Sequence, residues 1–245
     1  MPWPLLVVAG VAAGLSGSMA GLASLFSYPA LLAAGLPPLV ANQTNTIALA
    51  VGSVGSITGS RPELRGQGRR VWTLLPLTVA GGAVGGGLVL VTPSDTFALV
   101  VPFLVAAASL VLLRPPAPDR EGRTGRPTPW TVAGVVGVGV YSGYFGAAAG
   151  VVMLALLSRL FAEPLVRVNA VKNVLLGASN VVAAVGFVVF GDVAFGAALP
   201  LTAGLLVGNY CGPAIARRLP ARVLRVGIAL AGLVLAVVLF LRAVG

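Results

Sequence analysis

Apolar residues form a series of long runs along this chain of 245 residues. Runs of about 18 residues or more, enough to cross a bilayer as a helix, cover roughly 39–59, 72–92, 96–113, 168–190, 193–215 and 226–244. Two longer runs, at roughly 4–36 and 130–158, are interrupted by glycines. The pattern predicts an all-α polytopic membrane protein. The N-terminus, Met1-Pro2-Trp3-Pro4, lacks the basic segment of a cleaved signal peptide, so we expect the first run to stay in the protein.

The composition supports this class and excludes several others. The chain is 58% hydrophobic and 9% charged, with a mean hydropathy of +1.00, far from the balance of a soluble domain. It has no histidine and one cysteine, Cys211, which we expect to pack as a small buried apolar residue. A histidine-based metal site and an intrachain disulfide are therefore excluded. We expect neither an enzyme nor a cofactor or metal.

The net charge of +10 comes from arginines in the connections between apolar runs. This is the bias of cytoplasmic loops, so we expect no nucleic-acid partner. The arginine-containing breaks are 61–70, 114–126, 159–167 and 217–225, and the breaks without basic residues are 37–38, 93–95 and 191–192. The positive-inside rule predicts that the first set is cytoplasmic and the second external, with both termini outside.

The two halves of the chain repeat each other. Leu75-Pro76-Leu77-Thr78 recurs as Leu199-Pro200-Leu201-Thr202, and Ser16-Gly17 recurs as Ser142-Gly143, about 125 residues later. We divide the chain into a first membrane repeat (1–113), a cytoplasmic linker (114–129) and a second membrane repeat (130–245). If each glycine-interrupted run is a re-entrant helical hairpin followed by three crossings, the odd count makes the repeats inverted, as in many transporters. Duplication in a protein that transports nothing is the alternative.

Glycine-rich segments, Gly14–Gly21 and Gly139–Gly150, are predicted to turn the chain near the middle of the membrane. A helix that starts at such a turn points free N–H groups and its positive dipole end at a bound anion. The candidate binding positions there are Gly17, Ser18, Gly21, Gly143, Gly146 and Gly150. The competing interpretation is helix packing, which small residues also serve and which we expect of Gly204, Gly208 and Gly212.

Lys172 is the only lysine of the chain, and it lies in the apolar stretch 166–189. The six acidic residues all fall at breaks in the apolar pattern: Glu63, Asp95, Asp119, Glu121, Glu163 and Asp192. A lone charge inside a membrane is costly and by default marks a functional site. Without a nearby carboxylate, its partner is an anion from outside the protein. The alternative is that the side chain snorkels to the cytoplasmic interface.

Polar side chains follow each glycine break at helical spacing. Asn42, Asn45 and Thr46 share one face of a predicted helix; Asn169, Lys172 and Asn173 share another, and Asn180 follows. Amides and hydroxyls hold an oxyanion by hydrogen bonds without adding charge, so we predict that both sets bind substrate. Alternatively they join helices to each other, where each bond contributes about 0.6 kcal/mol.

These segments carry a family resemblance. The run Ala41-Asn42-Gln43-Thr44-Asn45-Thr46, followed by Gly52-Ser53, resembles the TauE/SafE family of sulfite and organosulfonate exporters. So do Asn169-Ala170-Val171-Lys172-Asn173-Val174 with Asn180, the turn Phe190-Gly191-Asp192-Val193, and Arg217-Arg218-Leu219-Pro220 with Leu224-Arg225. The family's Gly-x-x-Gly-x-Gly-Gly-Gly signature is altered: the second break has Gly143, Gly146 and Gly150 with Ala147–Ala149 between them, and the first keeps Gly17 and Gly21.

The resemblance implies a multi-pass permease of the bacterial inner membrane for small anions such as sulfite, sulfonates or sulfoacetate. With the repeats, it predicts a site between the two halves and transport by alternating access. Two alternatives stay open: an anion channel, and a membrane scaffold or subunit that transports nothing. The expected partners are the anion and the lipid bilayer, and the sequence leaves open whether copies form a homo-oligomer.

Overall fold

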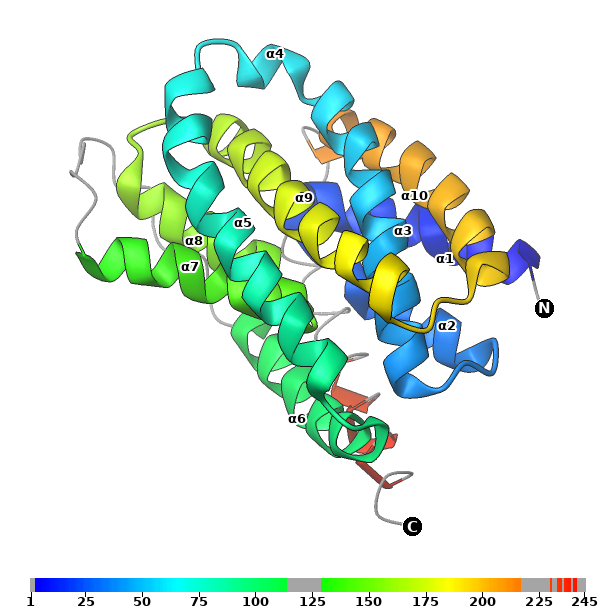
Figure 1. Ribbon diagram of the computed structural model, residues 1–245. Coiled ribbons are helices and arrows are strands. Elements are labelled where there is room, and N and C mark those ends of the chain that lie inside the picture. Colours follow the sequence, from blue (N-terminus) through cyan, green and yellow to red (C-terminus); the bar gives the residue numbers. More distant parts are fainter. Residues whose placement is uncertain are drawn as a thin grey trace.

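The computed structural model describes residues 3–113 and 129–216 and, near the C-terminus, 230, 233–234, 236–238 and 240–241 (Figure 1). Its elements are helices, which confirms the all-α prediction. They are α1 (Trp3–Ala20), α2 (Ser24–Ala33), α3 (Pro38–Gly59), α4 (Arg61–Leu64), α5 (Gly68–Val91), α6 (Ser94–Leu113), α7 (Pro129–Tyr144), α8 (Ala149–Leu160), α9 (Leu165–Phe190) and α10 (Phe195–Ala216). The predicted linker up to residue 128 and the arginine loop 217–225 lie outside the described residues.

Four of the described helices are long and apolar enough to cross a membrane by length and composition: α1, α5, α9 and α10. The central helix α3 has 22 residues, but it carries the polar run Asn42–Thr46 and is less apolar. The length of α3 is sufficient for a crossing, and its polar residues are buried. Helix α3 therefore needs the rest of the bundle to cover its polar face.

Both glycine-interrupted runs fold as pairs of helices with a break between them. The first break separates α1 from α2 at residues 21–23, and the second separates α7 from α8 at residues 145–148. Gly21 (φ 74°) and Gly146 (φ 72°) have the left-handed backbone that a glycine adopts without a steric penalty. Gly17 and Gly143 precede the breaks and lie in the last turn of their helices.

The arms of these helix pairs are unequal. Helices α1 and α7 have 18 and 16 residues, about 27 and 24 Å at 1.5 Å per residue. Helices α2 and α8 have only 10 and 12 residues. The first arms are therefore longer than the half-helices that we expected from the sequence.

Glycine faces hold the first arms against helices of the other half. A Cβ atom on Gly204 or Gly208 would collide with the backbone of α1 at Val7 or Val11, and one on Gly212 would collide with Ser18. The packing role predicted for these three glycines is confirmed. Cys211 is exposed, so its predicted burial is wrong: the glycines on either side of it, and not the cysteine, turn toward α1.

The same packing joins α5 and α7, where a Cβ atom on Gly81 or Gly85 would meet the backbone at Val136 or Val140. Residue numbers increase together along both contacts, so α1 runs parallel to α10 and α7 runs parallel to α5. Each broken helix of one half is therefore packed on an unbroken helix of the other half.

Connections predicted to share a side of the membrane lie together. At the end that we call the arginine end, Arg70 Nη1 lies 2.7 Å from Glu163 Oε1, and Arg167 Nη2 donates a 2.7 Å hydrogen bond to the carbonyl oxygen of Arg65. In Figure 1 this end carries α4, far from the turn between α9 and α10. The two connections 60–67 and 161–164 therefore share one end of the bundle.

The opposite end holds the connections 34–37 and 191–194. Gln43 Oε1 accepts a 2.8 Å hydrogen bond from the amide of Asp192, and Thr44 Oγ1 accepts one of 3.1 Å from the amide of Ala194. Helices α3 and α10 start at this end, and so does α1, which runs parallel to α10. Helices α5, α7 and α9 start at the arginine end. The two broken helix pairs thus enter the bundle from opposite ends, and their breaks meet where Gly21 packs against Gly150.

Candidate functional site

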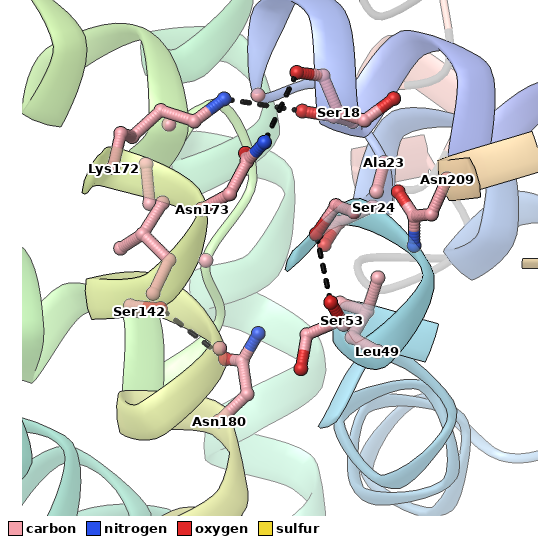
Figure 2. A pocket seen from close by; sticks show the side chains of 18 of the residues that line it. Ser18, Ala23, Ser24, Leu49, Ser53, Ser142, Lys172, Asn173, Asn180 and Asn209 are labelled. Atoms are coloured by element: carbon pink, nitrogen blue, oxygen red, sulfur yellow. Dashed lines mark hydrogen bonds between the residues drawn. The ribbon is translucent and has the colours of Figure 1, made fainter. Parts of the chain in front are cut away.

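A cavity of about 80 Å³ lies between α3 and α9 where the two helix breaks meet (Figure 2). It is large enough for a few water molecules or a small ion. Its lining residues are Gly17, Ser18, Gly21, Ala23, Ser24, Thr46, Leu49, Ser53, Ser56, Ser142, Phe145, Gly146, Ala149, Gly150, Lys172, Asn173, Leu176, Gly177, Asn180 and Asn209. This set contains hydroxyl, amide and backbone groups and a single charge.

That charge belongs to Lys172, the eighth residue of α9. Its side chain is only 1% exposed, and its Nζ donates a 3.2 Å hydrogen bond to the carbonyl oxygen of Gly17. The ammonium therefore ends inside the protein, so the snorkelling interpretation is wrong. Glu163 forms ion pairs with Arg70 and with Arg167, and Lys172 takes part in neither.

The local partner of Lys172 is the C-terminal end of α1. The last carbonyl groups of a helix have no partner within it and carry its negative dipole end. Asn169 Nδ2 donates to the carbonyl oxygen of Ser18 at 2.8 Å, and Asn173 Nδ2 to the same oxygen at 3.5 Å. The C-terminal end of a helix carries roughly half an elementary negative charge, so the end of α1 offsets only part of the charge of the ammonium. Since an ammonium has three N–H donors and one protein bond is found here, donors remain for a bound group.

The polar residues of the first half occupy a related place at the end of α7. Asn42 Nδ2 donates to the carbonyl oxygen of Tyr144 at 2.9 Å, and Asn45 Nδ2 to Ser24 Oγ at 3.3 Å. Thr46, whose hydroxyl bonds to the carbonyl oxygen of Asn42, lines the cavity. Asn42, Asn45 and also Asn169 are absent from the cavity wall and hold the broken helices in place.

Of the positions predicted at the glycine breaks, all but Gly143 line the cavity. Gly17, Ser18, Gly21, Gly146 and Gly150 line the cavity, together with Lys172, Asn173 and Thr46. Gly143 does not, because it packs on α5, where an added Cβ atom would collide with the carbonyl oxygen of Gly82. The first turns of α2 and α8 border the cavity through Ser24 and Gly150. The positive dipole end of a helix favours an anion at such a place, although the N–H groups of Ala149 and Val151 already bond to carbonyl oxygens of the break.

Six polar residues of the wall were not among the predicted site residues: Ser24, Ser53, Ser56, Ser142, Asn180 and Asn209. Ser53 and Ser56 continue the helical face of Thr46 and Leu49, so the spacing already contained that signal. Ser142 Oγ donates to Asn180 Oδ1 at 3.2 Å. Asn209, which donates to the carbonyl oxygen of Gly52 at 2.9 Å, lies among packing glycines, and no sequence pattern separates it from them.

Long apolar helices around a polar internal cavity define a multi-pass helical membrane protein. Residues 6–239 match the family model described as sulfite exporter TauE/SafE, and the chain belongs to this family. The membrane-transporter class follows from this membership and from the relatives described next, so the protein is a multi-pass membrane transporter.

Similar curated proteins come from several bacteria. A probable membrane transporter protein, ORF9, of Sinorhizobium sp is 30% identical over 236 residues, which cover 95% of this chain and 90% of that protein. The probable membrane transporter protein YfcA of Escherichia coli K12 is 30% identical over 223 residues, covering 88% and 79%. One from Haemophilus influenzae is 28% identical over 213 residues, covering 85% and 82%. No solved structure matches the chain.

Proposed function

We propose that this transporter moves small sulfur-containing anions, such as sulfite, sulfonates or sulfoacetate, across the bacterial inner membrane. The observation that carries the proposal is the buried ammonium of Lys172, which borders the cavity and has no carboxylate partner among the residues described. A bound anion would supply the missing opposite charge. The sulfur chemistry of the anion is inferred from the family description.

The remaining wall groups suit an oxyanion. Ser24, Ser53, Ser56 and Asn209 line the cavity, as does Gly150 in the first turn of α8. The hydroxyls of Ser53 and Ser56 now bond to carbonyl groups of their own helix and can rotate toward a bound anion, and the Asn209 amide has a second N–H besides the one bonded to Gly52. Bonds between such donors and an ionised acceptor are stronger than bonds between neutral groups. A volume of about 80 Å³ favours an anion of a few heavy atoms. The lining residues include no acid or cysteine, which supports transport without a chemical step.

Alternating access between inverted repeats is part of the proposal. Its support is the exchange of partners between the halves: α1 packs on α10 and α7 on α5, and the two broken pairs enter from opposite ends. Movement of these packed pairs about the central helices α3 and α9 would open the cavity to one end at a time. A channel would instead need a continuous path, and a scaffold would not need a buried charge beside a cavity.

Binding and flux measurements on the purified full chain test the proposal. Thermal-shift screening against sulfite, sulfate, thiosulfate, sulfoacetate and taurine identifies the best anion. Uptake of that anion into proteoliposomes should then saturate with concentration and show counterflow, which a channel does not. Stabilisation by none of these anions would count against the proposed substrate class.

A further inference from the structure

The wall of the cavity carries one charged side chain among the residues that the structure describes. Lys172 is 1% exposed, and the other lining residues are serines, asparagines, glycines, one threonine and apolar residues. Other charged residues of the described ranges, such as Arg70, Glu163 and Asp192, are absent from the wall. The described side chains therefore supply the cavity with a single positive charge.

The helix ends around the cavity add little to this charge. At the first break, the last turn of α1 lines the cavity at Gly17 and the first turn of α2 lines it at Ser24. At the second break, the last turn of α7 does so at Ser142 and the first turn of α8 at Gly150. A helix N-terminus carries roughly half an elementary positive charge and a C-terminus the corresponding negative charge. Each break therefore contributes two opposite charges that largely offset each other, and the net charge of the site stays close to that of one ammonium.

The charge of an anion decides how well it suits such a site. The free energy needed to take an ion out of water rises with the square of its charge, whereas its attraction to one ammonium rises only in proportion to that charge. An anion with one charge forms a neutral pair with Lys172. An anion with two charges would need about four times the dehydration energy, gain about twice the attraction, and keep one negative charge without a partner.

The neutral groups of the wall do not remove this difference, because several of their donors already have acceptors. The hydroxyls of Ser53 and Ser56 donate to carbonyl groups of α3 at 2.6 and 2.9 Å. Ser142 Oγ donates to Asn180 Oδ1 at 3.2 Å. A hydroxyl that turned toward a bound anion would lose its present bond. Lys172 is therefore the main group that compensates the charge of an anion here.

We propose that the cavity selects anions that carry a single negative charge. This inference rests on the proposed function and narrows its substrate class. Hydrogensulfite and simple sulfonates such as methanesulfonate carry one charge and fit the site. Sulfate, thiosulfate and sulfoacetate carry two charges at neutral pH and are disfavoured.

The test compares two anions that share a tetrahedral sulfur centre and a similar size but differ in charge. Methanesulfonate carries one negative charge and sulfate carries two. Calorimetric titration of the purified full chain with the two sodium salts, at one pH and at an ionic strength held constant with bulky gluconate, measures both dissociation constants. Methanesulfonate should bind at least about tenfold more tightly than sulfate, because the second charge of sulfate has no partner in the site.

Variants of two wall residues connect this preference to the charge of the wall. Asn180 lies about two turns after Lys172 on α9 and lines the same cavity (Figure 2). It is half-buried, so it tolerates a longer side chain better than the fully buried wall residues. Asn180→Lys adds a second positive charge and should reduce or reverse the preference for methanesulfonate. Asn180→Met is the matched uncharged control and should keep the preference, whereas Lys172→Met should weaken the binding of methanesulfonate. If Asn180→Lys does not fold, the two titrations of the wild type still decide.

Equal or tighter binding of sulfate by the wild type would overturn the charge selectivity and leave the proposed function intact. Binding of thiosulfate or sulfoacetate but not of methanesulfonate would have the same meaning. Nitrate, a singly charged anion without sulfur, separates the two ideas in the other direction. Binding of nitrate with no response to any sulfur-containing anion would overturn the proposed substrate class and keep the charge selectivity. Binding of none of these anions would overturn both.

Discussion

The ammonium of Lys172 in α9 donates a hydrogen bond of 3.2 Å to the carbonyl oxygen of Gly17, which is 155 residues away in the last turn of α1. The contact places a fixed positive charge at the negative end of one broken helix and at the edge of the central cavity. One residue thus ties the first half to the second and provides the charge that a small anion requires.

The first prediction concerns this charge. Lys172→Met keeps the bulk of the stem and removes the charge, so anion binding should weaken by roughly 1.5–3 kcal/mol, the range for bonds to charged groups. This is a dissociation constant about ten to a hundred times larger, measurable by calorimetric titration. Lys172→Arg should also impair binding, because a planar fork replaces a compact charge in a tight site. Asn173→Ala should cost about 1 kcal/mol.

Unchanged anion affinity in Lys172→Met would show that this lysine does not bind the substrate. Loss of expression in the methionine variant, with tolerance of arginine, would indicate that the lysine serves membrane insertion.

A second prediction compares two glycines of α7. Gly143→Ala should destabilise the protein by about 1–3 kcal/mol, as overpacking does, because the new methyl group collides with the backbone of α5 at Gly82. Gly137 has no neighbouring atom within 4 Å of an added Cβ. Gly137→Ala should therefore be neutral or stabilising by up to about 1 kcal/mol, since alanine favours a helix interior. Thermal unfolding in detergent measures both, and equal destabilisation would contradict the proposed packing.

Third, the predicted topology can be tested by labelling in intact cells on a Cys211→Ser background, which is needed because Cys211 is exposed. Gly68 is exposed at the arginine end, whereas the neighbouring Gln67 is buried and unsuitable. We expect Asp95→Cys to react with a membrane-impermeant reagent and Gly68→Cys to react only after permeabilisation. The reverse pattern would invert the assignment of the two ends.

The fourth prediction concerns Glu163, which forms ion pairs with Arg70 at 2.7 Å and with Arg167 at 3.0 Å. The hydrogen bond from Arg70 lowers the pKa of this carboxyl below its usual value. The carboxylate therefore stabilises the fold above the ordinary range of glutamate, and the effect disappears as the pH falls through the lowered pKa. Glu163→Gln should cost about 0.5–1 kcal/mol at neutral pH, as partly exposed pairs do.

The difference in melting temperature between wild type and Glu163→Gln should shrink below about pH 4. Asp95→Asn, at an exposed acid on the opposite end, is the matched control and should show little effect. A difference that stays constant down to low pH would mean that Glu163 acts through packing and not through its charge.

Much of this architecture could be predicted from local pattern alone. Apolar runs long enough to cross a bilayer predicted most of the helices, because the cost of burying backbone polar groups in lipid requires helices there. The two glycine-interrupted runs were expected to break, and they do so near Gly21 and Gly146. Lys172 stood out because a charge without a neighbouring acid is rare in an apolar helix.

Contacts between distant segments were decided only by the tertiary structure. Gly143 and Gly146 look alike in the sequence, yet Gly143 still belongs to α7 and packs on α5, whereas Gly146 lies in the break after α7 and lines the cavity. Asn42 and Asn169 were predicted to bind substrate, but each bonds to the end of a broken helix from the other half.

Asn209 joined the site through the packing of α10 on α3, which places its amide beside Gly52. Composition and helical spacing determine which residues a helix can present together. The packing of helices that are more than 100 residues apart determines what those residues meet, and no local pattern contains that information.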